Sequence, residues 1–447
     1  RVLHIYHEAG FRETRRERNE LELELHLAQV SETPELSKII TPVTPSTGLI
    51  KSPNYLVNQH VLPDTRSVII HSHRFEEYII GKDHPFITAR SRLFIDMCAR
   101  HNLLNLPGTQ ILEPEPIDEN SVLAYHDIQY YHYLVMASQG VFNPHMLSYG
   151  LGTDDNPVFR GVLEYAMLIV GASVMGADLL TSQPDIDLVF SPTGGLHHAG
   201  RNYASGFCYL NDIVIAIRYL LQQGLRVLYF DIDAHHGDGV QFAFYDEPRV
   251  LNISVHESAR TLFPWNSGFE NELGEGPGYG YNVNVPLAPG TEDEIYRDVF
   301  HRIVLPLARA YKPDICVLAA GVDTMYNDFM THLSLTNNIY AEVIREIRQQ
   351  VPKMLMLGAG GYNPLNIARD WTLAWAVLHD AEPEGDYFGQ MGGRAATAID
   401  GASLRDAYPF ISATKIAEAR AEAHRVMTYL EKHVFPIHGI GNDAGRT

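Results

Sequence analysis

The sequence predicts an α/β fold in which helices sandwich a central, mostly parallel β-sheet. Short apolar runs rich in Val, Ile and Leu alternate with helical patterns, and several of these runs are continuously apolar. Such alternation is typical of βαβ units, and continuous apolar strands are expected where helices cover both faces of a parallel sheet. In addition, several runs end in polar residues capable of chemistry. Ligands bind outside the carboxyl ends of such strands, so these ends predict one shared crevice.

Strand candidates recur through the middle of the chain. They are residues 67–72, 187–192, 226–233, 249–256, 314–323 and 353–362. Helical patterns lie between them, such as residues 210–223, which end before the natural C-cap Gly224, and residues 339–351. Residues 412–433 form an amphipathic pattern near the end. The apolar stretch 166–177 is too short to span a bilayer, so we expect a buried core helix there.

Changes in composition divide the chain into three parts. Residues 1–66 are charged and then rich in Pro, Thr and Ser, and we predict an N-terminal extension, a candidate for mediating homo-oligomer assembly. Residues 67–380 carry the strand and helix pattern and form the predicted main domain. We expect residues 381–447 to be a C-terminal helical segment packed on that domain.

Composition narrows the class of protein. The chain has 447 residues, 45% of them hydrophobic, which is ample for a large core. A formal net charge of −20 opposes direct binding of DNA or RNA and would favour cationic substrates, although solubility alone is the simpler explanation. The 3 cysteines are far apart and form no CxxC pair, which favours a reducing compartment. With no secretory signal at the start and no membrane span, we expect a cytoplasmic protein.

The stretch DIDAHHGDG, residues 231–239, is a dense cluster of metal-binding side chains. Asp233 and His235 are two residues apart at a strand end, so their side chains share a face, where both can bind one divalent cation. Asp323, at the end of another strand, is a candidate third ligand, although taken alone it is better read as a strand-end cap. Three protein ligands and an open position are typical of a catalytic zinc site, where the ion activates water and polarises a carbonyl.

Two adjacent histidines, His197 and His198, follow a Gly-Gly turn at the end of another strand candidate. Neighbouring histidines cannot easily bind one ion together, but a sharp turn lets both face a cleft as general base and general acid. Such histidines need carboxylate partners, and Asp231 and Asp238 are available in the metal stretch. A chance occurrence of two adjacent histidines in a loop is an equally good interpretation. We assign a structural role to His236, the remaining histidine of the stretch 231–239.

Tyr362 follows a strand candidate that ends in a glycine-rich run, where the backbone can bend close to a ligand. A phenol there can donate a hydrogen bond to an oxyanion as a carbonyl is attacked, although most of the 24 tyrosines must be packing residues. Gly206, Phe207 and Phe263 are candidate walls of an apolar substrate channel, and core packing is an equally good reading of them.

Together, several strings resemble the zinc-dependent histone deacetylase family, which includes bacterial acetoin-utilisation-type deacetylases. The matching strings are GKDHPF (81–86), LGTDDNP (151–157), GGLHHAGRNYASGFCYLND (194–212), VLYFDIDAHHGDGVQFAFY (227–245), GVDT (321–324) and MLGAGGY (356–362). They are long, occur in the family's order, and lie within residues 67–380. The resemblance implies an arginase/deacetylase fold and hydrolysis of the amide of an acylated lysine.

The resemblance also implies metal sites. One zinc ion per chain would be held by Asp233, His235 and Asp323. A structural potassium ion near the zinc would use the positions that match Asp231, Asp233, His235, Ser254 and Val255. A more distant potassium site would use Phe244, Val250 and Tyr281. There Glu247 stands where relatives often have a smaller hydroxyl residue.

The same resemblance assigns the catalytic roles. It pairs His197 with Asp231, and His198 with Asp238. His198 would be the general base and the acid for the leaving amine, while His197 acts mainly through its charge. Tyr362 would polarise the amide carbonyl and stabilise the tetrahedral oxyanion together with zinc.

The resemblance further implies a tunnel for an acyl-lysine-like chain, lined by Gly206, Phe207 and Phe263. Asp154 falls where the family holds substrate backbone amides, and Met330 falls on the loop beside the tunnel mouth. This sequence departs from many relatives at Ala359 in the glycine run, Leu262 before Phe263 and Thr153 before Asp154. These departures alter the shape of the tunnel or its rim and leave the reaction unchanged.

Three alternatives stay open. A ureohydrolase of the arginase type would share the fold but need two manganese ions and more aspartates than the string after Asp323 offers. A deacetylase of acetylpolyamines or other small acylated amines can use an acidic gatekeeper at the mouth, where this chain has Met330. A non-enzymatic binding module would have lost Tyr362 or a zinc ligand, and the sequence retains them all.

Overall fold

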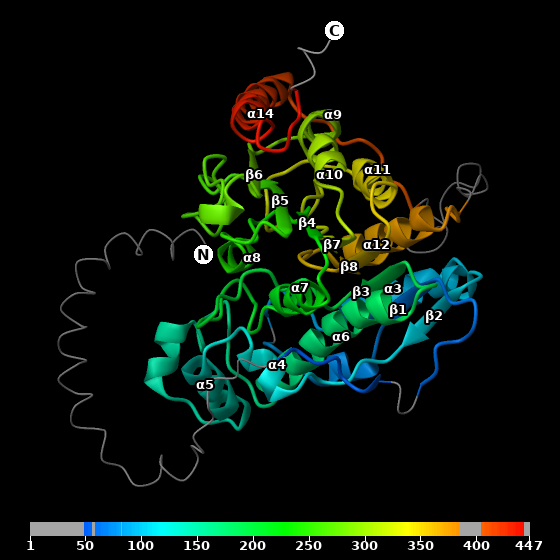
Figure 1. The fold of residues 1–447 in the computed structure, drawn as a ribbon, viewed down its shortest axis with the longest axis vertical. Coiled ribbons are helices and arrows are strands. Elements are labelled where there is room, and N and C mark those ends of the chain that lie inside the picture. The colour runs from blue at the N-terminus through cyan, green and yellow to red at the C-terminus, as the bar shows by residue number, and fades with distance from the viewer. Residues whose placement is uncertain (1–48, 56–58, 82, 384–403, 442–447) are drawn as a thin grey trace, which may run out of the picture. The chain divides into compact units, whose positions relative to one another are not determined.

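The computed structural model describes residues 49–55, 59–81, 83–383 and 404–441. Its centre is an 8-stranded sheet in the order β2-β1-β3-β8-β7-β4-β5-β6, in which every neighbouring pair is parallel (Figure 1). The strands are β1 (Ser67–Ile70), β2 (Thr109–Leu112), β3 (Leu188–Ser191), β4 (Val227–Asp231), β5 (Val250–Glu257), β6 (Asn282–Leu287), β7 (Ile315–Ala319) and β8 (Met354–Leu357). The predicted α/β class is confirmed, and the sheet is wholly parallel.

The strands depart from their predicted extents for a physical reason. Several predicted strands run past the observed ends: the predicted strand 314–323 stops at Ala319, and 353–362 stops at Leu357. The residues beyond these ends are buried too, so they look like strand in the sequence although they form the loops that carry the polar site. The two edge strands, β2 and β6, were not predicted, because the short β2 is only partly buried and β6 interleaves asparagines.

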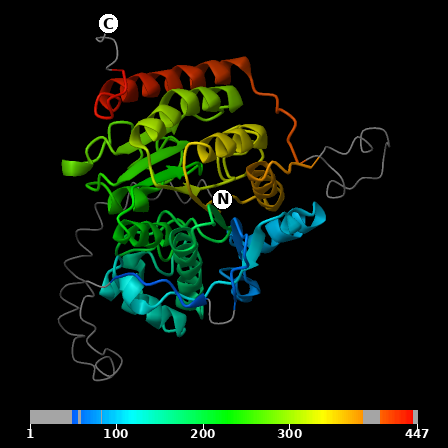
Figure 2. The ribbon, with the colours of Figure 1, turned by 45° about the vertical axis from the view of Figure 1, so that its right-hand side comes forward.

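Helices cover both faces of the sheet (Figures 1 and 2). They are α3 (Arg90–Arg100), α4 (Glu119–Leu123), α5 (Ile128–Ser138), α6 (Val162–Ser182), α7 (Asp212–Gln222), α8 (Asp238–Ala243), α9 (Asp293–Val299), α10 (Leu305–Tyr311), α11 (Asn337–Arg348), α12 (Pro364–Leu378) and α14 (Ala413–His433). Neighbouring residues of β3 show the two layers. Val189 faces Gly176 of α6, while the ring of Phe190 contacts Phe94 of α3 and Trp371 of α12.

Two helices test expectations drawn from apolar patterns. The stretch 166–177 lies in α6, and 83% of the most apolar window of this helix is buried inside the protein, as expected of a core helix. The amphipathic pattern 412–433 is α14, whose N-cap Ser412 accepts a hydrogen bond from the backbone N–H of Lys415. It packs against β6 and α9 through its buried face: Ala419, Ala423, Val426, Met427 and Leu430.

The sheet order brings the chemically capable strand ends side by side. β3, β8, β7 and β4 are consecutive in the sheet, although they are far apart in sequence. Their registers align Ser191 with Leu357, Leu357 with Ala319, and Ala319 with Asp231. The polar residues that follow this row therefore lie together at the carboxyl ends of these four strands, where ligands bind in open α/β sheets.

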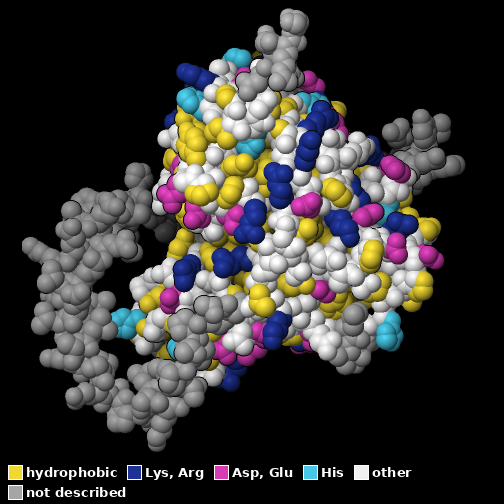
Figure 3. All heavy atoms as spheres, in the orientation of Figure 1, with side chains coloured by type: hydrophobic (Ala, Val, Ile, Leu, Met, Phe, Trp, Pro, Cys, Tyr) yellow, Lys and Arg dark blue, Asp and Glu magenta, His cyan; other side chains and the backbone are white. Residues whose placement is uncertain are grey.

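Three further features are the state of the cysteines, the charge on one face and the extent of the described residues. All three cysteines, Cys98, Cys208 and Cys316, are buried and free. On the face drawn in Figure 3, Lys and Arg side chains are interspersed with acidic and hydrophobic ones. Most of the predicted N-terminal extension, 1–66, lies outside the described residues, as does the segment 384–403.

Candidate active site

The tandem histidines stand on a turn that a buried carboxylate holds. β3 ends at Ser191, and the chain turns at Gly195, whose φ of +104° suits glycine. The carboxylate of Asp212, the first residue of α7, accepts hydrogen bonds from the backbone N–H groups of Gly195 at 2.9 Å and Leu196 at 2.7 Å. Sequence patterns do not reveal this role of Asp212, because acids open many helices for capping and dipole reasons alone.

The two histidines face each other through their outer ring nitrogens, with a carboxylate behind each. His197 Nδ1 lies 2.9 Å from Asp231 Oδ2, and His198 Nδ1 lies 2.8 Å from Asp238 Oδ1. The two Nε2 atoms are 3.0 Å apart, and both rings are buried. The structure thus brings each histidine together with the carboxylate that the resemblance assigns to it.

The pKa values of the two histidines shift in opposite directions, so that His197 is a cation and His198 a neutral base. Burial lowers the pKa of His197, but Asp231 and its neighbours outweigh it and raise that pKa to about 9. Burial and the nearby charges of His197 and His235 lower the pKa of His198 well below its ordinary value. When Nδ1 of His198 donates to Asp238, its Nε2 keeps a lone pair that can take a proton.

Asp233, His235 and Asp323 come together beyond the ends of β4 and β7. All three are buried, and their ligand atoms lie within 4.8 Å of one another. His235 Nδ1 is 3.1 Å from Asp233 Oδ1 and 2.9 Å from Asp323 Oδ2. Backbone N–H groups hold the carboxylates: Ala234 donates to Asp323 Oδ1 at 2.9 Å, and Gly360 donates to Asp233 Oδ2 at 2.5 Å.

The charge and donor chemistry of this cluster fit a divalent cation such as zinc. Burial and the charge of Asp233 raise the pKa of Asp323 to about 7, which shows that two carboxylates crowd here. Burial lowers the pKa of His235, but its bonds to both carboxylates raise it to about 10 overall. The cluster therefore favours a positive charge between its carboxylates, and one imidazole with two carboxylates is a donor set that zinc accepts.

The glycine run lets the chain after β8 pass against the cluster. A Cβ at Gly360 would lie 2.4 Å from Oδ2 of both Asp233 and Asp323, so only glycine fits there. Ala359, the departure in this run, has a φ of +56°. This left-handed conformation costs a non-glycine residue about 1–2 kcal/mol, which explains why glycine is the easier residue at this position.

Tyr362 stands beside the cluster on the segment that follows β8. Its ring centroid lies 6.2 Å from that of His235 and 5.8 Å from that of Phe207. Burial and the charges of Asp323 and Asp233 raise the pKa of the phenol well above its ordinary value, so the hydroxyl keeps its proton. A neutral phenol at this position can donate a hydrogen bond to a developing oxyanion.

The predicted channel walls contact the histidine pair and Tyr362. The ring of Phe263 lies 4.9 Å from that of His198, and Phe207 contacts Tyr362. The backbone at Gly206 lies so close to the ring of His198 that a Cβ there would be 2.3 Å from His198 Cδ2. All three wall residues are half-buried, which suits the lining of an accessible channel better than core packing.

Asp154 and Met330 lie further out. Asp154 is exposed, and the backbone carbonyl of the next residue, Asp155, lies 3.2 Å from His84 Nε2. His84 in turn contacts the wall residue Phe207, with ring centroids 4.6 Å apart. Met330 is half-buried on the loop after β7. Their exposure is what a position at the rim requires.

The residues predicted to bind potassium lie on or near strands β4, β5 and β6. Ser254 and Val255 lie on β5, and the register pairs Ser254 with Asp231 of β4. The more distant set lies at the start of β5, before β6 and after α8: Val250, Tyr281 and Phe244. The carboxylate of Glu247, near that set, bonds to the guanidinium of Arg249 at 2.6 and 2.9 Å.

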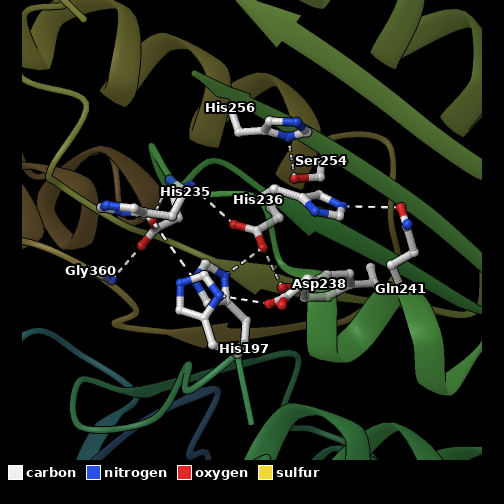
Figure 4. A network of polar contacts seen from close by, with 12 residues as sticks. His197, His235, His236, Asp238, Gln241, Ser254, His256 and Gly360 are labelled. Atoms are coloured by element: carbon white, nitrogen blue, oxygen red, sulfur yellow. Dashed lines mark hydrogen bonds and ion pairs between the residues drawn. The ribbon is translucent and has the colours of Figure 1, made fainter. Parts of the chain in front are cut away.

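His236 turns away from the metal-binding cluster, as Figure 4 shows. Its Nε2 lies 3.0 Å from Gln241 Oε1, and its Nδ1 lies 3.1 Å from Ser267 Oγ. Burial and the charge of His256 lower its pKa well below the ordinary value, so the ring is neutral. This environment suits the structural role assigned to His236.

Comparisons with known proteins identify the family of the chain. The histone deacetylase domain model matches residues 84–378. The acetoin utilization protein AcuC of Bacillus subtilis is 37% identical over 325 residues, which are 71% of this chain and 83% of that protein. Human histone deacetylase 1 is 37% identical over 327 residues, which are 70% of this chain and 66% of the human protein.

Solved structures show the same fold. A histone deacetylase homologue in complex with SAHA matches with a TM-score of 0.71 and 26% identity, over 82% of this chain and 100% of the other. A homologue from Aquifex aeolicus matches with a TM-score of 0.70 and 27% identity, over 81% of this chain and 100% of the other. The parallel sheet between helices is thus the arginase/deacetylase fold. By domain match, by sequence and by fold, this chain belongs to the histone deacetylase family.

Proposed function

We propose that this protein is a zinc-dependent deacetylase that hydrolyses the amide of an acylated lysine side chain. Membership of the family establishes the deacetylase class of hydrolase. The observation that best supports the finer proposal is that the three-residue ligand cluster meets the buried histidine pair: His197 Nε2 lies 3.9 Å from Asp233 Oδ1, and the ring centroid of His198 lies 6.0 Å from that of His235. A base beside a metal-binding cluster suits hydrolysis by water.

The metal would be held by Asp233, His235 and Asp323, the cluster whose donors fit zinc. When bound, zinc supplies Lewis-acid chemistry, which acidifies water and polarises an amide carbonyl. A potassium ion would occupy the positions nearby, on Asp231, Asp233, His235, Ser254 and Val255. Because these residues lie on the neighbouring strands β4 and β5 or just beyond β4, potassium would support the placement of the ligand strand.

The chain's own side chains would move the protons. His198 Nε2 accepts a proton from the water whose oxygen bonds to the carbonyl carbon. When the C–N bond breaks, His198 gives that proton to the leaving nitrogen, so the products are a carboxylic acid, which keeps the second proton of the water, and an amine; the acid then loses its proton to solvent. The imidazolium of His197 and the hydroxyl of Tyr362 stabilise the negative charge that develops on the carbonyl oxygen. Asp231 and Asp238 keep the two rings oriented.

The residues proposed to line the channel support the substrate assignment. The half-buried walls Gly206, Phe207 and Phe263 are apolar and suit the methylene chain of an acylated lysine, whose charge the acyl group has removed. The exposed carboxylate of Asp154 would accept backbone N–H groups of a peptide substrate at the rim, with Met330 on the loop beside it.

Location and partners remain proposals as well. The three buried, free cysteines suit a reducing compartment, so we propose a cytoplasmic protein. The net charge of −20 argues against nucleic acid or an anionic membrane surface as direct partners. The N-terminal extension stays the candidate for assembling a homo-oligomer.

A panel of acylated substrates tests the function. We expect hydrolysis of acetyl-lysine peptides, inhibition by the hydroxamate SAHA, and at least about tenfold lower kcat/KM for acetylspermidine, because a rim built for a peptide gives a polyamine fewer contacts. The matched control is Asp323→Asn, purified identically, which reports any contaminating deacetylase. Preference for acetylspermidine would support the polyamine alternative instead. Absence of hydrolysis across the panel would overturn the substrate assignment.

Metal content is a separate prediction. We expect elemental analysis to find one zinc ion per chain, and removal by a chelator to lower the unfolding temperature, because the ion binds only the folded cluster. At free zinc a thousand times its Kd the stabilisation is about 4 kcal/mol. Zinc added back should restore the unfolding temperature. Two manganese ions per chain would instead indicate ureohydrolase-type chemistry, and an unchanged melting curve would show that Asp233, His235 and Asp323 hold no ion.

A further inference from the structure

One buried carboxylate ties the loop after β7 to the segment that carries Tyr362. Asp328, only 7% exposed, accepts hydrogen bonds on Oδ2 from the backbone N–H groups of Tyr362 at 2.8 Å and Asn363 at 3.1 Å. Its Oδ1 accepts a third bond from the backbone N–H of Met330 at 3.0 Å. The same side chain therefore contacts the backbone of Tyr362 and the backbone of the loop that bears Met330.

The segment before Tyr362 needs such an anchor. It follows a glycine-rich run, and Gly361 has a φ of +136°, a conformation open mainly to glycine. Gly360 is fixed by its bond to Asp233, and α12 begins only at Pro364. Between these points the buried N–H groups need acceptors, and Asp328 supplies one to each of two consecutive residues.

We propose that Asp328 is a positioning residue for the deacetylase reaction. It orients the backbone of Tyr362 so that the phenol stands at the metal-binding cluster, and it links that phenol to the loop that bears Met330. The inference rests on the proposed function, because Asp328 acts through the phenol and contacts no reacting atom.

The chemistry of a carboxylate explains why other residues serve poorly here. Both oxygens of Asp328 accept, and three N–H groups converge on them. An asparagine has one accepting oxygen, and its NH₂ group would face at least one backbone N–H, donor against donor. The ring of Phe329, 66% exposed, lies 6.4 Å from that of Tyr362, so a displaced loop would also disturb the surroundings of the phenol.

Hydrogen exchange followed by mass spectrometry tests the anchor without reference to activity. In Asp328→Ala we expect the peptide containing the amides of Tyr362 and Asn363 to exchange at least about tenfold faster, since alanine leaves these two amides without their acceptor. Asn327→Ala is the matched control: it removes a bond from the same loop to α12, from Asn366 Nδ2 to Asn327 Oδ1 at 2.7 Å, and leaves the Tyr362 amide paired.

A double-mutant cycle then tests the role. We expect Asp328→Ala to lower kcat, and kcat/KM equally, by about ten- to a hundredfold, because misplacement of a catalytic group by about 1 Å has this effect. In a Tyr362→Phe background the same substitution should lower kcat/KM less than about twofold, since the group that Asp328 positions is already gone. A purely structural residue would cause the same fold-loss in both backgrounds.

The two experiments can each overturn the positioning role of Asp328. Unchanged exchange at the Tyr362 amide, or equal fold-losses in the two backgrounds, would overturn the positioning role. If Asp328→Ala does not yield folded protein, Asp328→Leu, which fills a similar space and also has no acceptor, takes its place in both experiments. If the wild-type chain hydrolyses no acylated lysine, the proposed function fails, and hydrogen exchange alone still shows whether Asp328 holds the Tyr362 segment.

Discussion

His198→Ala is expected to lower kcat about a thousandfold, within the range that a positioned general base contributes. The proposed base is the Nε2 atom of His198, because Nδ1 is occupied by Asp238 at 2.8 Å and the lowered pKa keeps the ring neutral. Alanine removes this acceptor and also the donor for the leaving amine. Both proton transfers then depend on solvent water instead of a positioned side chain.

Steady-state kinetics on an acetyl-lysine peptide measures this loss, and elemental analysis measures retained zinc. The zinc should stay, because His198 is not one of the three ligands. His301→Ala is the matched control, since this exposed histidine pairs with Glu346 on the surface and its loss should leave turnover unchanged. Near wild-type turnover of His198→Ala would remove His198 from the mechanism.

Tyr362→Phe is expected to lower kcat about a hundredfold, the effect of removing one donor to a developing oxyanion. The substitution deletes only the hydroxyl, so the ring contacts with Phe207 and His235 remain. Because the hydrogen bond strengthens as negative charge develops, kcat and kcat/KM should fall together while KM changes little.

The control for this variant is Tyr279→Phe, which removes a hydroxyl from a half-exposed tyrosine outside the site. Zinc content and unfolding temperature should match the wild type in both variants. A rise in KM with unchanged kcat would show that the phenol of Tyr362 contributes only to substrate binding.

The sequence predicted the location of the site better than its geometry. Continuous apolar runs ending in SPTGGLHH, DIDAHH, GVDT and GAGGY identified the strand ends, because buried parallel strands leave a strong pattern. It could not show that β3, β8, β7 and β4 are neighbours, since strand order has no local signature. The pairing of His198 with Asp238 rested on the resemblance, and the 2.8 Å contact now places the two together.

Other features had no sequence signal at all. Asp212 and Asp328 each bind backbone N–H groups of a distant segment, and such contacts leave neither a periodicity nor a spacing in the chain. The predicted strands also overran their ends, because the loop residues beyond Ala319 and Leu357 are as buried as the strands. Zinc and potassium remain predictions until metal content is measured.

The distance in sequence between the cluster residues has a consequence for when the proposed zinc ion can bind. The bond from Gly360 to Asp233 spans 127 residues, and that from Ala234 to Asp323 spans 89. Contacts of such long range form slowly, after most of the chain has been synthesised and the central strands have paired. During translation, a chain released only as far as Asp233 and His235 offers an incomplete chelate. Metal capture should therefore be a late event in biogenesis, unlike the capture that drives the folding of a zinc finger.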